Sequence, residues 1–118
     1  MRLEERGILA RIRATLPGGE ALLDDCGALP TPPAGHTLLV TTDLMESDQH
    51  FRLDWHPPDL LARKLLAVNL SDLDASGARP LGYTLTLALG PELTEAWLEA
   101  FLQGLGQASR DWDVKVLG

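Results

Sequence analysis

Residues 81–89 constrain the fold of this chain more than any other segment. Every odd-numbered residue in it is a leucine or a tyrosine, and every even-numbered residue is a glycine, a threonine or an alanine. Successive side chains of a β-strand point to opposite faces, so the alternation predicts a strand with one heavy apolar face and one face of small residues. Such a strand needs other elements to cover its apolar face, which favours a layered domain.

Helices are expected on both sides of this strand in the sequence. Residues 1–16 carry apolar side chains at loosely helical intervals, and the Pro-Gly-Gly of residues 17–19 ends that segment. A second helix is expected from about Pro58 to Ala75, because proline and aspartate suit a first turn and Gly77 stands where a C-terminal cap belongs. A third is expected over residues 92–108, with an apolar stripe made of Leu93, Ala96, Trp97, Ala100, Phe101, Gly104, Leu105 and Ala108. Trp97 and Phe101 lie four residues apart on this stripe and are expected in the core.

Further strands complete the expected sheet. Residues 37–42 are partly β-branched and apolar through the middle, which is typical of a buried strand, and residues 113–117 predict a last strand. Residues 20–29 form a short apolar run that Asp24 and Asp25 interrupt. We therefore expect one α+β domain over residues 1–118. It should be a two-layer sandwich in which a mixed sheet of about four strands carries helices on one face.

Charge and cysteine content argue against several classes of function. Ten basic and seventeen acidic residues give a net charge of −7, which disfavours a general binder of nucleic acids or anionic membranes. The single cysteine, Cys26, excludes an intramolecular disulfide and a cysteine-based zinc site. No apolar run reaches membrane-spanning length and the charged start lacks the apolar stretch of a signal peptide, so we expect a cytoplasmic protein. Neither glycine-rich phosphate-binding motif occurs, and the histidines lack metal-ligand spacing.

Acidic residues gather where the expected strands and helices end. Asp24 and Asp25 lie in the first strand region, Asp43 ends the strand at residues 37–42, and Asp72 and Asp74 lie near the end of the second helix. Magnesium prefers carboxylate and hydroxyl oxygens, so carboxylates from three elements could converge on one site. Solvated charges at strand and helix ends are the alternative, and the residues by themselves favour that alternative.

Several motifs, taken together and in this order, resemble a known family. Asp24-Asp25-Cys26 follows the first helix, and the T-T-D of residues 41–43 leads to the H-F of residues 50 and 51. The A-V-N-L-S-D of residues 67–72 then leads to the G-A-R-P of residues 77–80. This series strongly resembles the N-terminal domain of the thiamine-monophosphate kinases. They belong to a superfamily that also includes aminoimidazole ribonucleotide synthetase and selenophosphate synthetase.

The resemblance implies an activity and a set of site residues. The family transfers the γ-phosphoryl group of ATP to thiamine monophosphate, giving thiamine diphosphate, with several Mg²⁺ ions held by aspartates. It implies that Asp25, Asp43 and Asp72 are metal ligands and that Thr42 adds an oxygen near the metals. It also implies that Asp25, Thr41 and Thr42 bind the nucleotide. His50 would bind the substrate.

Some residues depart from the family pattern. Leu23 and Asp48 stand where the family usually has glycine, and Asp74 stands where it usually has a small residue, so we expect Asp74 to be a surface charge. The family's enzymes are more than twice as long and continue, after their last N-terminal strand, into a Gly-Gly-Asp-Thr segment and a second domain. This sequence stops at Gly118. We therefore expect an N-terminal part that is inactive alone.

Three functional hypotheses remain open. The first is the N-terminal part of a thiamine-monophosphate kinase, which in this superfamily forms a homodimer through packed sheets. The Thr84, Thr86 and Ala88 face of the strand at residues 81–89 would be the contact, and a solvated polar face is the alternative. The second is a non-catalytic dimerisation or metal-binding remnant of the family. The third is another superfamily member, against which the placement of residues 50 and 51 argues.

Overall fold

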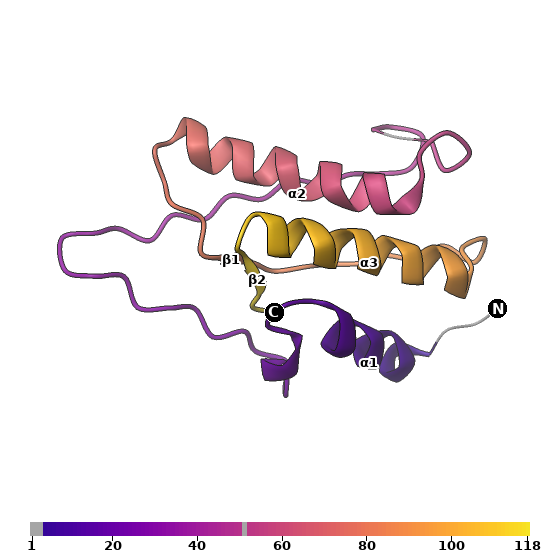
Figure 1. The fold of residues 1–118 in the computed structure, drawn as a ribbon, viewed down its shortest axis with the longest axis horizontal. Helices are drawn as coiled ribbons and strands as arrows, with labels where there is room; N and C mark the ends of the chain where they lie inside the picture. Colours follow the sequence, from indigo (N-terminus) through magenta and orange to yellow (C-terminus); the bar gives the residue numbers. More distant parts are fainter. Residues whose placement is uncertain (1–3, 51) are drawn as a thin grey trace.

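The computed structural model describes residues 4–50 and 52–118. In these residues it contains three α-helices, one short 3-10 helix and two short strands, within extents of 49 × 30 × 21 Å (Figure 1). In chain order the elements are α1 (Glu5–Thr15), η1 (Gly19–Ala21), α2 (Pro58–Ala75), β1 (Gly82–Tyr83), α3 (Glu95–Asp111) and β2 (Lys115–Val116). The first residues of the helix expected over 1–16, and the phenylalanine of the H-F pair, lie outside the described residues.

Helix α3 is the centre of the fold because it lies between α2 and α1 (Figure 1). The core is formed by Ile12, Leu16, Leu61, Ala62, Leu66, Leu98, Phe101, Leu102, Leu105, Ala108, Val114 and Val116. Phe101 is buried and its ring stacks on that of Trp97 with centroids 5.3 Å apart, which confirms their expected place in the core. Leu98 and Leu102 lie off the predicted stripe yet are almost fully buried, since α3 has neighbours on more than one side.

The ends of the helices follow local sequence signals. Helix α2 has the bounds that its sequence predicts, and Gly77 closes it with a φ of +72°. Glycine adopts this left-handed conformation without steric cost, and the N–H groups of Gly77 and Ala78 donate to carbonyls of the last turn. Helix α3 begins later than expected because the hydroxyl of Thr94 accepts a hydrogen bond from the N–H of Trp97, at 3.1 Å.

Two ion pairs and one glycine join the helices. Arg11 of α1 lies 3.2 Å from Glu95 of α3, and Arg63 of α2 lies 2.8 Å from Asp111 of α3. Helices α2 and α3 approach closely at Gly104, where a β-carbon would lie 2.7 Å from the carbonyl carbon of Asp59. None of the described helices is both long enough and apolar enough to cross a bilayer.

The expected four-stranded mixed sheet is wrong. Over residues 4–50 and 52–118, the sheet has two parallel strands, in which Gly82 pairs with Lys115 and Tyr83 with Val116. Two further hydrogen bonds extend the pairing, from the Leu117 N–H to the Tyr83 carbonyl and from the Leu85 N–H to the Gly118 carbonyl. Helix α3 provides the crossover that parallel strands require. The fold is therefore mostly helical, with a minimal sheet.

The missing strands are extended segments without a hydrogen-bonding partner. Residues 22–50 and 52–57 form a long excursion from the helices that ends at the start of α2 (Figure 1). Within it, the backbone of residues 37–42 makes no hydrogen bond to the described part of the chain, and Val40 is 83% exposed. A β-strand exists only as part of a ladder, so an apolar, β-branched segment without a partner stays irregular.

The alternation at residues 81–89 nevertheless has the predicted consequence for burial. Tyr83, Leu85, Leu87 and Leu89 are half-buried and pack against the core, whereas Thr84, Thr86 and Ala88 are exposed. Over residues 83–89 the two faces are thus separated as the sequence predicts, whereas Leu81 is 46% exposed, and only Gly82 and Tyr83 belong to a strand.

Candidate functional site

The first pair of candidate ligands lies on a turn after η1. Asp24 and Asp25 are both exposed, and a carboxylate oxygen of Asp24 accepts a hydrogen bond from the N–H of Cys26, at 2.9 Å. This contact makes Asp24 the cap of the turn and leaves the carboxylate of Asp25 facing solvent. Leu23, which stands at a family glycine position, is 76% exposed and does not adopt a positive φ. The leucine is therefore accommodated without backbone strain.

The second group of candidates lies on the unpaired extended segment. Thr41, Thr42 and Asp43 are exposed, and a carboxylate oxygen of Asp43 accepts a hydrogen bond from the N–H of Leu44, at 2.9 Å. Because the segment has no partner strand, these oxygens are held only by the local chain. Asp72 is placed differently, since it lies on the exposed side of the last turns of the rigid helix α2.

The candidate ligands are not gathered into one cluster. Among residues 4–50 and 52–118, no three acidic, histidine or cysteine side chains are close enough to hold a metal ion. Within the same residues, Asp25, Asp43 and Asp72 form no ion pair, so no basic side chain neutralises their carboxylates. Carboxylate and threonine oxygens are the hard ligands that Mg²⁺ prefers. The donor set therefore fits magnesium in chemistry, on three separate segments.

His50 lies in a tight turn that begins at Glu46. The Nδ1 atom of His50 accepts a hydrogen bond from the N–H of Glu46 at 2.9 Å, so a neutral His50 carries its proton on Nε2. Asp48 lies within this turn and adopts a φ of +65°. It stands where the family has glycine, and aspartate is one of the few other residues that tolerate the left-handed region. The turn thus keeps a glycine-like backbone despite the different residue.

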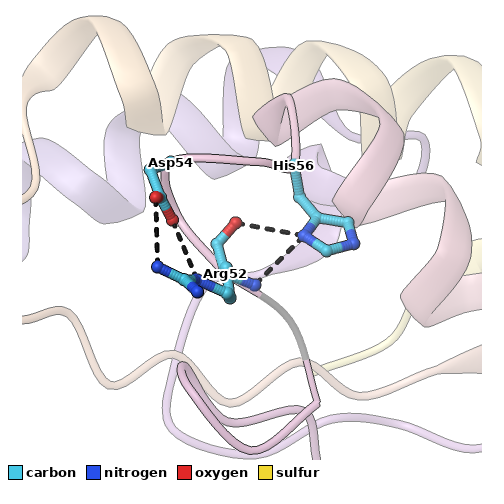
Figure 2. Close-up of polar contacts among 3 residues, drawn as sticks. All are labelled: Arg52, Asp54 and His56. Atoms are coloured by element: carbon cyan, nitrogen blue, oxygen red, sulfur yellow. Dashed lines mark hydrogen bonds and ion pairs between the residues drawn. The ribbon is translucent and has the colours of Figure 1, made fainter.

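A second turn follows directly, and none of the sequence motifs points to it. Arg52 forms an ion pair with Asp54 at 3.3 Å (Figure 2). Its guanidinium also lies 4.0 Å from the centroid of the Trp55 ring. The N–H groups of Trp55 and His56 donate to the carbonyl of Arg52, and Nδ1 of His56 lies 3.0 Å from both the nitrogen and the oxygen of Arg52. The spacing of Arg52 and Trp55 is the signal that could have drawn attention to this turn.

Two polar contacts away from these turns perturb the pKa of their members. The hydrogen bond from Arg63, helped by one from Gln107, holds the pKa of the Asp111 carboxyl below its usual range. Burial raises the pKa of the Tyr83 phenol, and the hydrogen bond with Ser109 at 2.8 Å partly opposes that rise. Both contacts tie secondary-structure elements together, and neither lies near a candidate ligand in the sequence.

An open apolar groove of about 450 Å³ lies between α1, the segment at residues 85–91 and the start of α3. Its lining includes Ile8, Leu9, Leu85, Leu87 and Leu98. None of the residues that the family resemblance implies lines this groove. We therefore attribute the groove to the way α1 and α3 pack on the alternating segment at residues 81–89, and not to a binding site of the family.

Comparison with known proteins identifies the relatives of this chain. Residues 23–118 match the family model described as AIR synthase related protein, N-terminal domain. A thiamine-monophosphate kinase of Synechococcus elongatus is 37% identical over 98% of this chain and 35% of its own length. The corresponding enzyme of Escherichia coli is 46% identical over 80% of this chain and 28% of its own length. That of Caulobacter vibrioides is 38% identical over 93% of this chain and 32% of its own length.

The relatives confirm the resemblance that the motifs carry. The chain spans about a third of the length of the curated relatives it matches, 35% in the Synechococcus elongatus case, and corresponds to their N-terminal part. The family model covers most of the chain, including every candidate ligand, His50 and both turns around it. The chain belongs to the AIR synthase related protein family and carries its N-terminal domain.

Proposed function

We propose that this chain is the N-terminal, magnesium- and nucleotide-binding part of a kinase that uses ATP to convert thiamine monophosphate to thiamine diphosphate. The observation that carries the proposal is the name of its relatives, thiamine-monophosphate kinase, at 37% and 46% identity over 98% and 80% of the chain. Three exposed carboxylates that form no ion pair with the residues described by the structure support it, because a polyanionic substrate bound by an acidic chain requires cations. The proposal also places the protein in the cytoplasm.

Each candidate residue has a part in the proposed reaction. Asp25, Asp43 and Asp72, with the hydroxyl of Thr42, would hold Mg²⁺, which when bound neutralises charge on the phosphate oxygens. The hydroxyls of Thr41 and Thr42 are exposed and can donate hydrogen bonds to the nucleotide. The carboxylate of Asp25 would accept a hydrogen bond from the nucleotide.

The transfer itself requires little covalent chemistry from the protein. An oxygen of the substrate phosphate forms a bond to the γ-phosphorus of ATP, the bond from that phosphorus to the β,γ-bridging oxygen breaks, and ADP leaves. Positioning therefore dominates catalysis. His50 can position the substrate by donating from Nε2, because its Nδ1 already accepts from the N–H of Glu46.

The proposal includes a homodimer through the face of residues 81–89. Thr84, Thr86 and Ala88 are exposed on that face, and small or β-branched side chains suit close contact between sheets. A charge at the centre of such a contact would be buried without a partner. We expect Thr84→Glu to shift the mass measured by light scattering from dimer to monomer, with Ala34→Glu on an exposed loop as control. An unchanged dimer in Thr84→Glu would reject this face as the contact.

The metal role of Asp72 can be tested against a neighbour on the same helix. Asp72→Asn and Asp74→Asn each remove one exposed carboxylate from the end of α2, so both variants should keep the stability of the parent. Only Asp72→Asn should weaken binding of Mg-ATP, measured by calorimetric titration. Equal affinity of the two variants and the parent would reject Asp72 as a ligand.

A non-catalytic dimerisation or metal-binding module is the second candidate. The observation that favours it is the separation of the acidic side chains, which form no metal-binding cluster in the described part of the chain. A transfer assay with Mg-ATP and thiamine monophosphate, combined with a binding titration, tests the two candidates. Thiamine diphosphate above a no-protein control, detected by mass, would reject the module. Because the kinase part is itself expected to be inactive alone, absence of product is expected of both candidates, and binding of thiamine monophosphate would then favour the kinase part.

A further inference from the structure

Trp55 is an exposed aromatic side chain that the fold does not need. It is 69% exposed, and it belongs neither to the core cluster nor to the side chains that pack against it. Leaving a large apolar ring in water forgoes the free energy that burial would provide. The packing of this chain therefore gives no reason for a tryptophan at this position.

The turn holds Trp55 in one orientation despite its exposure. The N–H of Trp55 donates to the carbonyl of Arg52, and the guanidinium of Arg52 lies 4.0 Å from the ring centroid. Asp54 fixes that guanidinium through two hydrogen bonds of 3.3 Å, as Figure 2 shows. One face of the ring is thus covered by a cation that is paired with a carboxylate, and the remainder of the ring is exposed to solvent.

The position of the turn links it to the proposed substrate site. Residues 52–56 lie between the turn of His50 and the start of α2, whereas Asp72 lies near the other end of that helix. A flat indole in the turn that follows the one of His50, the proposed substrate-positioning histidine, is suited to stacking on another aromatic ring. Thiamine monophosphate carries two such rings, an aminopyrimidine and a cationic thiazolium, and a cationic ring is attracted to the face of an indole.

We infer that Trp55 is a substrate-binding residue on which a heteroaromatic ring of the phosphate-accepting substrate stacks. The inference rests on the proposed function. Adenine of ATP is the other heteroaromatic ring in the reaction. The acceptor is the better match because Trp55 shares its segment with His50, whereas Thr41, Thr42 and Asp25 belong to other segments. Arg52 and Asp54 position the ring and do not themselves contact the substrate.

The test compares binding of thiamine monophosphate and of Mg-ATP to four forms of the protein. These are the parent, Trp55→Ala, Trp55→Phe and Trp112→Ala. Trp112 is the matched control, because it also lies under an arginine, with Arg63 at 4.6 Å from its ring, but sits at the end of α3. Circular dichroism checks that each variant is folded. Trp55 is exposed, so its replacement should leave the helical signal unchanged.

Trp55→Ala should lower the affinity for thiamine monophosphate about tenfold, within the range found when stacking aromatic residues are replaced by alanine. It should leave the affinity for Mg-ATP unchanged. Trp55→Phe should keep most of the affinity but lose the quenching of tryptophan fluorescence that the substrate produces in the parent. Trp112→Ala should resemble the parent. If Trp55→Ala bound thiamine monophosphate as tightly as the parent, the stacking role would be overturned while the proposed function would stand. A variant that lost affinity only for Mg-ATP would have the same consequence. A parent that does not bind thiamine monophosphate would overturn the proposed function and this inference with it.

Discussion

Replacing Gly104 by alanine tests how closely α2 and α3 approach. A β-carbon at this position would lie 2.7 Å from the carbonyl carbon of Asp59, and closer still to its Cα and oxygen. Carbon atoms without a bond between them prefer separations of about 3.5–4.0 Å. The obstacle is backbone, which cannot rotate away as a side chain would. The two helices must therefore move apart at this contact.

Two opposing effects determine how much Gly104→Ala changes the free energy of unfolding. Overpacking of this kind costs about 1–3 kcal/mol, and we take about 2 kcal/mol, because Asp59 lies in the first turn of α2 where the helix can shift. Alanine gains about 1 kcal/mol over glycine in a helix interior. The expected net effect of Gly104→Ala is a destabilisation of about 1 kcal/mol. A β-carbon added to Gly7 of α1 would have no atom within 4 Å, so Gly7→Ala should stabilise by about 0.5 kcal/mol.

Urea unfolding followed by circular dichroism measures both variants against the parent. The difference between Gly104→Ala and Gly7→Ala contains the steric cost of about 2 kcal/mol, less the roughly 0.5 kcal/mol by which alanine gains more at Gly104 than at Gly7, which lies in the first turn of α1. We expect that difference to be about 1.5 kcal/mol, with opposite signs for the two variants. If Gly104→Ala stabilised the protein as much as Gly7→Ala, the close approach of α2 and α3 would be refuted.

Three further predictions concern single residues. Tyr83 is the only tyrosine, so absorbance at alkaline pH reports its pKa directly. The midpoint of this titration should lie above pH 10 because of burial, and it should rise further in Ser109→Ala, which loses the hydrogen bond. The contribution of Tyr83 to the free energy of unfolding should be complete below pH 10 and should fall as the pH rises beyond it. The lowered pKa of Asp111 means that its pair with Arg63 contributes fully above pH ~4 and is lost as the pH falls through the folded-state value. Arg63→Gln should remove that part of the acid dependence in urea unfolding, and an unchanged acid profile would contradict it. Asp48→Gly should stabilise by about 0.5 kcal/mol, because glycine adopts a positive φ more readily, and a destabilisation in thermal unfolding would count against the turn at φ +65°.

The helices could be predicted from the sequence because their signals are local. The bounds of α2 follow from proline and aspartate at its start and Gly77 at its end, all within the helix or next to it. The predicted start of α3 is too early because the cap depends on one hydroxyl, that of Thr94, in a run where several residues suit a first turn. The burial of Leu98 could not be predicted because it depends on how many neighbours surround α3, which periodicity does not report.

The predicted sheet is wrong because strands depend on partners. Residues 37–42 have the composition of a buried strand, yet a ladder needs a second segment at hydrogen-bonding distance, and the described chain offers none. From Tyr83 onward, the alternation at residues 81–89 does predict which side chains face the core, whereas Leu81 is exposed. Which face a residue occupies is a local property of an extended segment, whereas membership of a sheet is not.

The candidate site shares this dependence on partners. Thr41, Thr42 and Asp43 continue directly from the unpaired residues 37–40, so whatever fixes that segment also fixes these oxygens. Asp72 is already held by α2, and the turn of His50 is closed by its own hydrogen bond to Glu46. Local sequence thus determines the elements that carry Asp72 and His50. The placement of Asp43, in contrast, depends on whether its segment pairs with another strand. The proposed metal site is built on both kinds of element, so we expect metal binding to require that pairing, whether the proposed dimer or another segment supplies the partner strand.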